Sequence, residues 1–398
     1  MKKSMKAVLI LSMVSLPLFA CEKTQEKTNK LEPTTLEKQD ERQGFSDLGK
    51  SAKKTFQNSD VFSIALASDD VLGIDVEGVT HNAIENTDST KNMNFAVNGI
   101  SGDFRFARAI ADDQGNSAPQ MSSVDVSAQS VHWDYQSGES RSARTRNNIA
   151  FSAFVEDETL YFDPSNENLI NLVKDIFDMA GFGDYKMLVS TFLSDKYFVT
   201  AEGIEEELKP YMDMIGDIEN PFDGVTVDYD AVGTAINRLV VFLDEHYEDY
   251  SSWLSVYGNG QGEYVFYASF TTEEVVKFIL DYADAEHRED LAANLEGLDV
   301  HSLEFALTFD ADGFKALKTV FDFRYEMKTD AYDLDGGMIF ANDESMGIPE
   351  KIGHTQWQID VDGGFTLTFG DQAPTVPEDL SSYRDLIQMI KDLESLVQ

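Results

Sequence analysis

Long stretches of the chain alternate between apolar and polar residues, which is the period of a β-strand with one face buried and the other in water. The clearest stretches are 303–309 and 317–327, which flank Asp312-Gly313 and predict a β-hairpin. Stretches 357–361 and 365–369 flank Asp362-Gly363-Gly364 and predict a second hairpin. Shorter alternating runs occur at 72–76, 104–106 and 131–135.

Helical periodicity interrupts the strands in four segments. Thr271 and Glu274 have the spacing of a capping box and lead into one of these segments. The segments begin near Asp163, Asp230, Thr271 and Pro377. Strands and helices do not alternate strictly, which argues against a parallel βαβ sheet. The pattern predicts an α+β fold, with long antiparallel meander strands forming a curved sheet or incomplete barrel and amphipathic helices on one face.

The first twenty residues have the pattern of a secretory signal peptide. Three lysines precede an apolar run at 7–18, which is shorter than the roughly 18 residues that span a bilayer. The run ends in Leu18-Phe19-Ala20-Cys21, which resembles the lipobox of bacterial lipoproteins. The resemblance implies cleavage after residue 20 and acyl chains such as palmitate on Cys21. Two or more chains anchor a protein stably, which implies an extracytoplasmic location on the cell membrane, or on the outer membrane of a two-membrane envelope.

Cys21 is the only cysteine of the chain. A single cysteine excludes an internal disulfide and a redox pair. The other interpretation of Cys21 is a chance thiol within a signal peptide that is cut elsewhere.

Residues 21–57 are polar and contain few large apolar side chains. Such a segment buries too little surface to offset its ordering entropy, so we expect a flexible tether behind the anchor. Basic and acidic residues nearly balance in this segment. Almost all of the acidity therefore falls on the body, residues 58–398.

The whole chain carries 31 basic and 72 acidic residues, a net charge of −41. A body this negative would be repelled by nucleic acid, so nucleic-acid binding is not expected. Cations or a basic protein partner would be attracted. The other interpretation of the charge is solubility, or adaptation to a salty medium.

The body divides into two similar halves, 58–215 and 228–398, which we expect to form either one unit or two lobes. Meandering strands, striped helices and the ending Phe369-Gly370-Asp371…Val376-Pro377-Glu378 behind a lipidated cysteine resemble the LolA and LppX/LprG type of lipoprotein fold. In that family a curved, incompletely closed barrel holds lipid-like ligands beneath its helices. The resemblance implies the same for this chain.

Signatures of catalysis are missing: the chain has no G-x-S-x-G, H-E-x-x-H, Walker A or G-x-G-x-x-G motif. Asp-x-Asp-Gly sequences at 310–313, 333–336 and 360–363 match only the start of a calcium loop and are better explained as turns. The acidic run 244–249 could hold a hard cation weakly, or could simply be a solvated helix end. We therefore expect no enzyme activity, no cofactor and no metal.

One aromatic stripe is the candidate ligand site: Phe305, Phe309, Phe321, Phe323 and Tyr325. Every half-buried sheet needs an apolar face, so the stripe is either core or the lining of a cavity. The leading hypothesis is a non-enzymatic lipoprotein that binds or carries a hydrophobic ligand. The alternative is an acidic surface module for a basic protein partner or cations.

Overall fold

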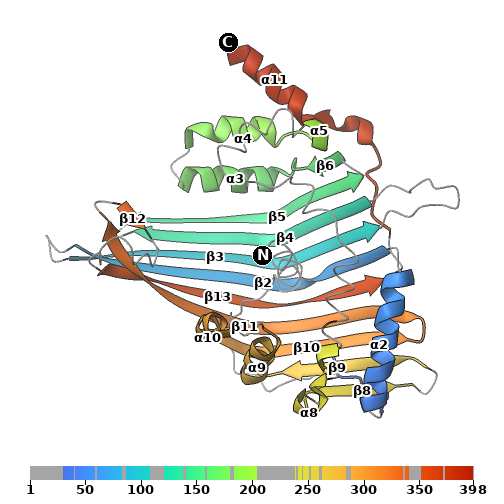
Figure 1. The fold of residues 1–398 in the computed structure, drawn as a ribbon. Coiled ribbons are helices and arrows are strands. Elements are labelled where there is room, and N and C mark those ends of the chain that lie inside the picture. The colour runs from blue at the N-terminus through green and yellow to red at the C-terminus, as the bar shows by residue number, and fades with distance from the viewer. Residues whose placement is uncertain are drawn as a thin grey trace.

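The computed structural model describes residues 30–39, 41–58, 61–82, 87–107, 121–137, 140–156, 159–179, 183–203, 238, 241–243, 245–250, 252–259, 262–283, 288–334, 337–339, 351–370 and 373–397. The expected signal peptide (1–20) and Cys21 lie outside these residues. The described chain forms one large, strongly curved β-sheet with helices packed along it (Figure 1).

Among the described residues, the sheet contains 14 strands in the order β1-β8-β9-β10-β11-β13-β2-β3-β4-β5-β6-β7-β14, with β12 paired to β11. All neighbouring strands among the described residues are antiparallel except β7 and β14, so the expected antiparallel sheet is confirmed. The strands are β1 (Glu37–Lys38), β2 (Val61–Asn82), β3 (Thr87–Ala107), β4 (Met121–Ser137), β5 (Ser140–Glu156), β6 (Thr159–Asp163), β7 (Tyr197–Thr200), β8 (Leu254–Gly258), β9 (Tyr264–Phe270), β10 (Leu298–Asp310), β11 (Gly313–Leu334), β12 (Gly337–Ile339), β13 (Lys351–Phe369) and β14 (Arg384–Asp385).

The two halves of the chain share this sheet. Strands β2 to β7 form one side and β8 to β13 the other, and they meet where β2 pairs with β13. That ladder runs from Phe62 opposite Phe369 to Thr80 opposite Gly353. Because its hydrogen bonds continue across the junction, halves 58–215 and 228–398 do not form separate sheets.

The first predicted hairpin is confirmed and the second is wrong. Strands β10 and β11 pair around Asp312-Gly313, with Leu303 opposite Phe321. By contrast, Asp362-Gly363-Gly364 lies inside the single strand β13, at a register shift against β2. At this position the two glycines allow neighbouring groups of β2 and β11 to approach the backbone of β13 closely. A Cβ on Gly364 would lie 2.5 Å from the Thr319 carbonyl oxygen, and one on Gly363 would lie 2.7 Å from the Asp70 carboxyl carbon.

A line of irregular residues crosses the middle of the sheet. Strand β2 shifts register between Leu66 and Asp70. Gly99 of β3 has a φ of 61° and Asn148 of β5 a φ of 54°, both left-handed. Such bulges increase bending and twist, and Figure 1 shows β2 to β5 bending together along their length.

The described part of the segment expected to be a tether, residues 30–39 and 41–57, is structured and packs on the sheet, which corrects the prediction for these residues. Its first residues, Lys30 and Leu31, lie on the polar face of the sheet, where their backbone N–H groups donate to Glu304. Strand β1 then covers the sheet edge at β8, and helix α2 (Glu41–Asn58) packs on the apolar face. This helix has few large apolar residues, but it buries small ones, such as Ala52, closely against the sheet.

The C-terminus covers the opposite edge in the same way. Residues 373–383 cross the polar face as a strap, which contains a short 3-10 helix, η6 (Leu380–Ser382), and whose Thr375 N–H donates to Ser123 of β4. Strand β14 then pairs with β7, and Ile387 of helix α11 (Leu386–Val397) packs against Val199. The expected helix after Pro377 therefore begins later than predicted. Both ends of the sheet are protected against edge-to-edge pairing.

Two other helix predictions are confirmed. Helix α3 (Glu167–Met179) follows β6, and its Leu169 and Leu172 pack against the cluster that contains Val131, Trp133 and Ile149. Helix α9 (Thr272–Tyr282) has the predicted capping box, in which Thr271 and Glu274 satisfy each other's backbone N–H groups. Of the segment expected near Asp230, only 238, 241–243 and 245–250 are described. Shorter helices are η1 (Gly183–Tyr185), α4 (Lys186–Phe192), α5 (Ala201–Gly203), α8 (Tyr247–Tyr250) and α10 (Arg288–Leu295).

No helix among the described residues is both long and apolar enough to span a bilayer.

Candidate functional site

Three rows of apolar side chains cross five neighbouring strands on one face of the sheet. Residues directly opposite each other in a ladder share a face, so the registers define the rows. The outer row holds Met327, Trp357, Val76, Met93 and Tyr135. The middle row holds Tyr325, Ile359, Ile74, Phe95 and Trp133. The inner row holds Phe323, Val361, Leu72, Val97 and Val131.

Exposure rises from the inner row to the outer row. Phe323 is 2% exposed and Val131 4%. At the other end of the same strands, Met327 is 39% exposed, Met93 38% and Tyr135 37%. The rows therefore run from a packed core to an open apolar rim, and we call the whole set the apolar rows.

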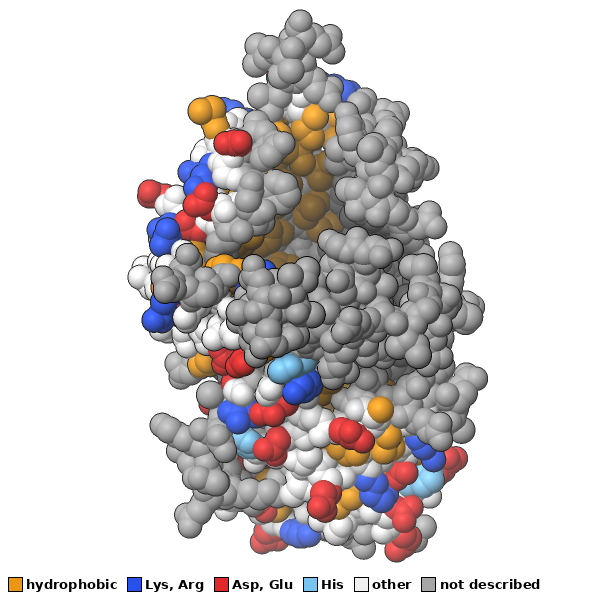
Figure 2. All heavy atoms as spheres, turned by 90° about the vertical axis from the view of Figure 1, so that its left-hand side faces the viewer, with side chains coloured by type: hydrophobic (Ala, Val, Ile, Leu, Met, Phe, Trp, Pro, Cys, Tyr) orange, Lys and Arg blue, Asp and Glu red, His pale blue; other side chains and the backbone are white. Residues whose placement is uncertain are grey.

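The open end of the sheet is hollowed. Figure 2 looks at the left-hand ends of the strands in Figure 1 and shows hydrophobic side chains gathered deep in a recess in the upper half of the view. Single exposed apolar residues are ordinary, but a contiguous apolar surface marks a binding site or interface. Hydrophobic side chains deep in a recess suit an apolar ligand.

Strand β5 continues the three rows with polar side chains. Opposite Tyr135, Trp133 and Val131 stand Ser142, Arg144 and Arg146. Arg146 reaches Asp175 of helix α3, with its Nε 2.7 Å from Oδ2, and this ion pair fastens the helix over the rows. The apolar face thus ends in a cationic border on the β5 side.

The sequence-predicted aromatic stripe falls into two groups. Phe309, Phe321 and Phe323 are buried in packed clusters and form core. Phe305 is partly buried against Phe270, with ring centroids 5.9 Å apart. Of the five, only Tyr325 belongs to the less buried part of the apolar rows, in the middle row.

Sequence patterns did not identify the outer-row residues or Arg144 as members of a site. Alternation was visible at 131–135 and 317–327, but the registers that align these strands are long-range. The wide separation of Met327 and Met93 in the chain gives no local signal that they share a row.

The acidic motifs have structural explanations where they are described. Asp310 accepts hydrogen bonds from the backbone N–H groups of Asp312 and Gly313, which closes the β10–β11 turn. Asp360 is held by Arg324, at 3.1 Å. Asp335 and Asp244 lie outside the described residues. Among the described residues, no three His, Cys, Asp or Glu side chains gather as a metal site would require.

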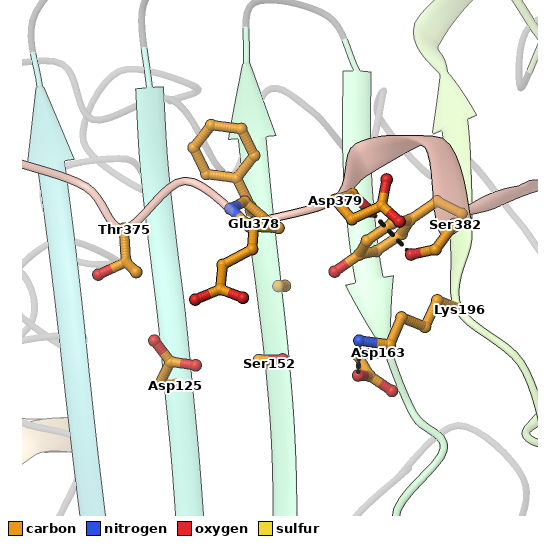
Figure 3. Close-up of a pocket in the computed structure, with 12 residues that line it drawn as sticks. Asp125, Ser152, Asp163, Lys196, Thr375, Glu378, Asp379 and Ser382 are labelled. Atoms are coloured by element: carbon orange, nitrogen blue, oxygen red, sulfur yellow. Dashed lines mark hydrogen bonds and ion pairs between the residues drawn. The ribbon is translucent and has the colours of Figure 1, made fainter.

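A polar pocket of about 340 Å³ lies on the opposite face, beneath the C-terminal strap (Figure 3). Lys196 forms an ion pair with Asp163 at 2.9 Å. Burial raises the pKa of Asp163, but hydrogen bonds from Ser165 and Lys196 outweigh burial and hold this pKa below its usual value. Burial, with the charge of nearby Asp103, raises the pKa of Asp125.

The polar contacts of this pocket are structural, because they hold protein segments together. Its lysine is already neutralised by a carboxylate, and the Ser382 hydroxyl donates to the Asp379 carbonyl oxygen at 2.7 Å instead of to a base. In Figure 3 the Glu378 side chain points from the strap toward Asp125 of β4. These contacts join the strap to the sheet.

A second polar pocket, of about 300 Å³, crosses β13, β2, β3 and β4 behind the outer row. Carboxylates and side-chain amides alternate in it, including Asp75, Glu77, Asn92 and Gln356. Asn94 donates to Asp75 across the β2–β3 ladder. The two faces at this end of the sheet therefore differ sharply, one apolar and the other acidic and amide-rich.

Comparison with known proteins gives no family. No family model matches the chain, and no curated protein matches it. Among solved structures, the chain is similar to a beta-barrel-like protein of a domain of unknown function from Brucella abortus. That likeness has 6% sequence identity and a TM-score of 0.15, and covers 75% of this chain and 98% of the other. At these values the likeness carries no functional argument.

Proposed function

We propose that this protein is a non-enzymatic binding protein that holds or carries a hydrophobic ligand against the apolar rows. The observation that carries the proposal is the exposure of Met327, Met93 and Tyr135 in one continuous cross-strand row. A carrier needs apolar surface that is open to a ligand and yet shielded from other proteins. The rim of a curved sheet provides both.

The proposal includes an architecture. The curved sheet acts as an incompletely closed barrel, and its helices lie on the apolar face. The contacts of Leu48 in α2, Leu172 in α3 and Val275 in α9 with clusters from the apolar face support this arrangement. The helices then form the second wall of the ligand site, and the polar face is turned to water.

The proposal also includes an anchor. From the lipobox-like Leu18-Phe19-Ala20-Cys21 we infer that the protein is exported from the cytoplasm and held to a membrane by acyl chains on Cys21. Cys21→Ser should release the protein from the membrane fraction or stall its processing. A variant that is cleaved normally and still sediments with membranes would remove the anchor from the proposal.

Ligand binding is tested by titrating the delipidated protein with an environment-sensitive fluorescent fatty acid. Met93→Gln places an amide in the outer row and should weaken probe binding about five- to ten-fold, the effect of losing one buried apolar side chain of about 1–1.5 kcal/mol. Asn92→Gln changes the adjacent residue on the opposite face and should leave binding unchanged. Equal binding by both variants and the wild type, or no binding by the wild type, would contradict the proposal.

The second candidate function is docking of a basic partner on the polar face. The carboxylates and amides that line the second polar pocket, Glu77 and Asn92 among them, favour it because their oxygens can accept hydrogen bonds from lysine and arginine side chains. An interaction of this kind would weaken steeply with salt. Fatty-acid binding at the apolar rows would not.

A further inference from the structure

Arg144 of β5 and Trp133 of β4 stand directly opposite each other at the end of the middle row. Side chains in this relation lie about 5 Å apart at their Cβ atoms and project from the same face of the sheet. The apolar row therefore ends in two hydrogen-bond donors, an indole N–H and a guanidinium.

Arg144 differs from Arg141 and Arg146 of the same strand because no described carboxylate pairs with it. Its guanidinium donates to the carbonyl oxygen of Ala143, next to it in the chain, and it forms no ion pair with a described residue. Five other described arginines are ion-paired: Arg105 with Asp103, Arg141 with Asp134, Arg146 with Asp175, Arg324 with Asp360 and Arg384 with Asp195. An exposed guanidinium beside an apolar row is thus left available to an external anion.

Trp133 supplies an independent observation. Its side chain is only 2% exposed, and its Nε1 is buried without a hydrogen-bond partner among the described residues. A buried donor without an acceptor is destabilising, and native proteins rarely keep one. A ligand atom that accepts this hydrogen bond would explain why an indole, and not a phenyl ring, occupies this position.

We propose that the hydrophobic ligand carries an anionic headgroup, a carboxylate or a phosphate, which binds Arg144 and the indole N–H of Trp133 while its acyl chain lies along the apolar rows. This inference rests on the proposed function and names the ligand class. The guanidinium provides charge and two parallel donors, and Trp133 provides a third donor in a site with little water. The acyl chain would run from β5 across β4 and β3 toward the outer row.

The test compares ligands that share one saturated chain and differ in the headgroup: the fatty acid, the alkyl phosphate and the fatty alcohol. Competition with the fluorescent fatty acid gives a Kd for each. Arg144→Gln should raise the Kd of the acid and of the phosphate about ten-fold or more and change the Kd of the alcohol by less than about two-fold. A charge-assisted hydrogen bond contributes far more to binding than a neutral one. Arg141→Gln is the matched control, because it removes the same charge from the same strand on the opposite face.

Trp133→Phe keeps an aromatic ring and removes only the N–H. It should weaken the acid and the phosphate about three- to ten-fold without lowering the melting temperature of the ligand-free protein, because the change also removes an unsatisfied donor. A structural role alone would instead lower the melting temperature and affect acid and alcohol equally.

The outcomes separate this inference from the function on which it rests. Loss of acid binding alone identifies a carboxylate ligand, and loss of phosphate binding alone a phosphate; either result supports the shared chemistry. If the acid and the alcohol bind with equal affinity, both to the wild type and to Arg144→Gln, the inference of an anionic headgroup is contradicted. The proposed function as a carrier of a hydrophobic ligand would still stand. Failure of the wild type to bind any of the three would overturn both.

Discussion

The buried carboxylate of Glu304 accepts a hydrogen bond from the backbone N–H of Leu31, 2.9 Å away, across 273 positions of the chain. The same carboxylate accepts the N–H of Lys30 at 3.1 Å and the Tyr267 hydroxyl at 3.3 Å. One side chain of β10 therefore fixes Lys30 and Leu31, the first described residues, to the polar face.

Removing that carboxylate should release the N-terminal segment. Glu304→Leu should cost about 2–3 kcal/mol in the free energy of unfolding, the contribution of a hydrogen-bonded buried charge, and should raise amide exchange at 30–39. Glu304→Gln keeps one acceptor oxygen and should cost less. Urea denaturation and hydrogen exchange measure both effects. Unchanged exchange at 30–39 in Glu304→Leu would show that β1 alone holds the segment.

Tyr267 should make stability fall at alkaline pH. Burial and the charge of Glu304 raise its pKa to about 12 from 10.0. Because the folded pKa lies above the unfolded one, the contribution is complete below pH 10 and is lost as pH rises toward 12. The unfolding free energy of the wild type should decline over this window, and Tyr267→Phe should decline less. Identical slopes would contradict the assignment.

The core and the rim should respond differently to truncation. Phe321 is buried in a packed cluster, so Phe321→Ala should cost about 3–5 kcal/mol. Tyr135 is more than one-third exposed in the outer row, and Tyr135→Ala should cost about 1 kcal/mol while weakening fatty-acid binding. Chemical denaturation and probe titration of the two variants check this. A loss of several kcal/mol for Tyr135→Ala would place the outer row in the core.

Gly99 should be hard to replace for two reasons. Its φ of 61° costs an L-residue about 1–2 kcal/mol, and a Cβ would lie 2.4 Å from Gln129. Gly262 has a φ of 94° and nothing within 4 Å of an added Cβ. Gly99→Ala should therefore lower the melting temperature more than Gly262→Ala does. Equal losses would mean that Gln129 moves aside freely, leaving backbone strain as the whole effect.

Local patterns in the sequence predicted the local elements well. The β10–β11 hairpin follows from alternation around Asp312-Gly313, and the α9 capping box follows from the spacing of Thr271 and Glu274. Each of these depends on neighbouring residues only. The sequence therefore contained enough to place most long strands and to predict an antiparallel sheet.

The errors arose where local signals had a long-range cause. Gly363 and Gly364 resemble a turn, but they make room for Asp70 and for the backbone of β11 at a bulge. Helix α2 lacks an apolar stripe because it packs through small residues. Ser51 donates to the Asp310 carbonyl oxygen, and Thr55 accepts the N–H of Phe314.

The candidate site was the least predictable part. Phe309, Phe321 and Phe323 were found by alternation, which identifies a buried face but does not show where along the strands that face opens. The place where the apolar face becomes exposed depends on the lengths of the strands and on their register. The pairing of Trp133 with Arg144 requires the β4–β5 ladder, in which a shift of one residue would turn every side chain to the other face.

The central claim is that a hydrophobic ligand lies along the apolar rows, and the tryptophans provide its most direct test. Trp357 belongs to the outer row, whereas Trp253 packs against Tyr250 and Phe270 in a separate cluster. A fatty acid brominated in mid-chain quenches only the indoles that it touches. We predict that saturating brominated ligand quenches the wild type, that Trp357→Phe lowers the quenched fraction, and that Trp253→Phe raises it. Absence of quenching in the wild type, or a quenched fraction that falls in Trp253→Phe and not in Trp357→Phe, would contradict the account.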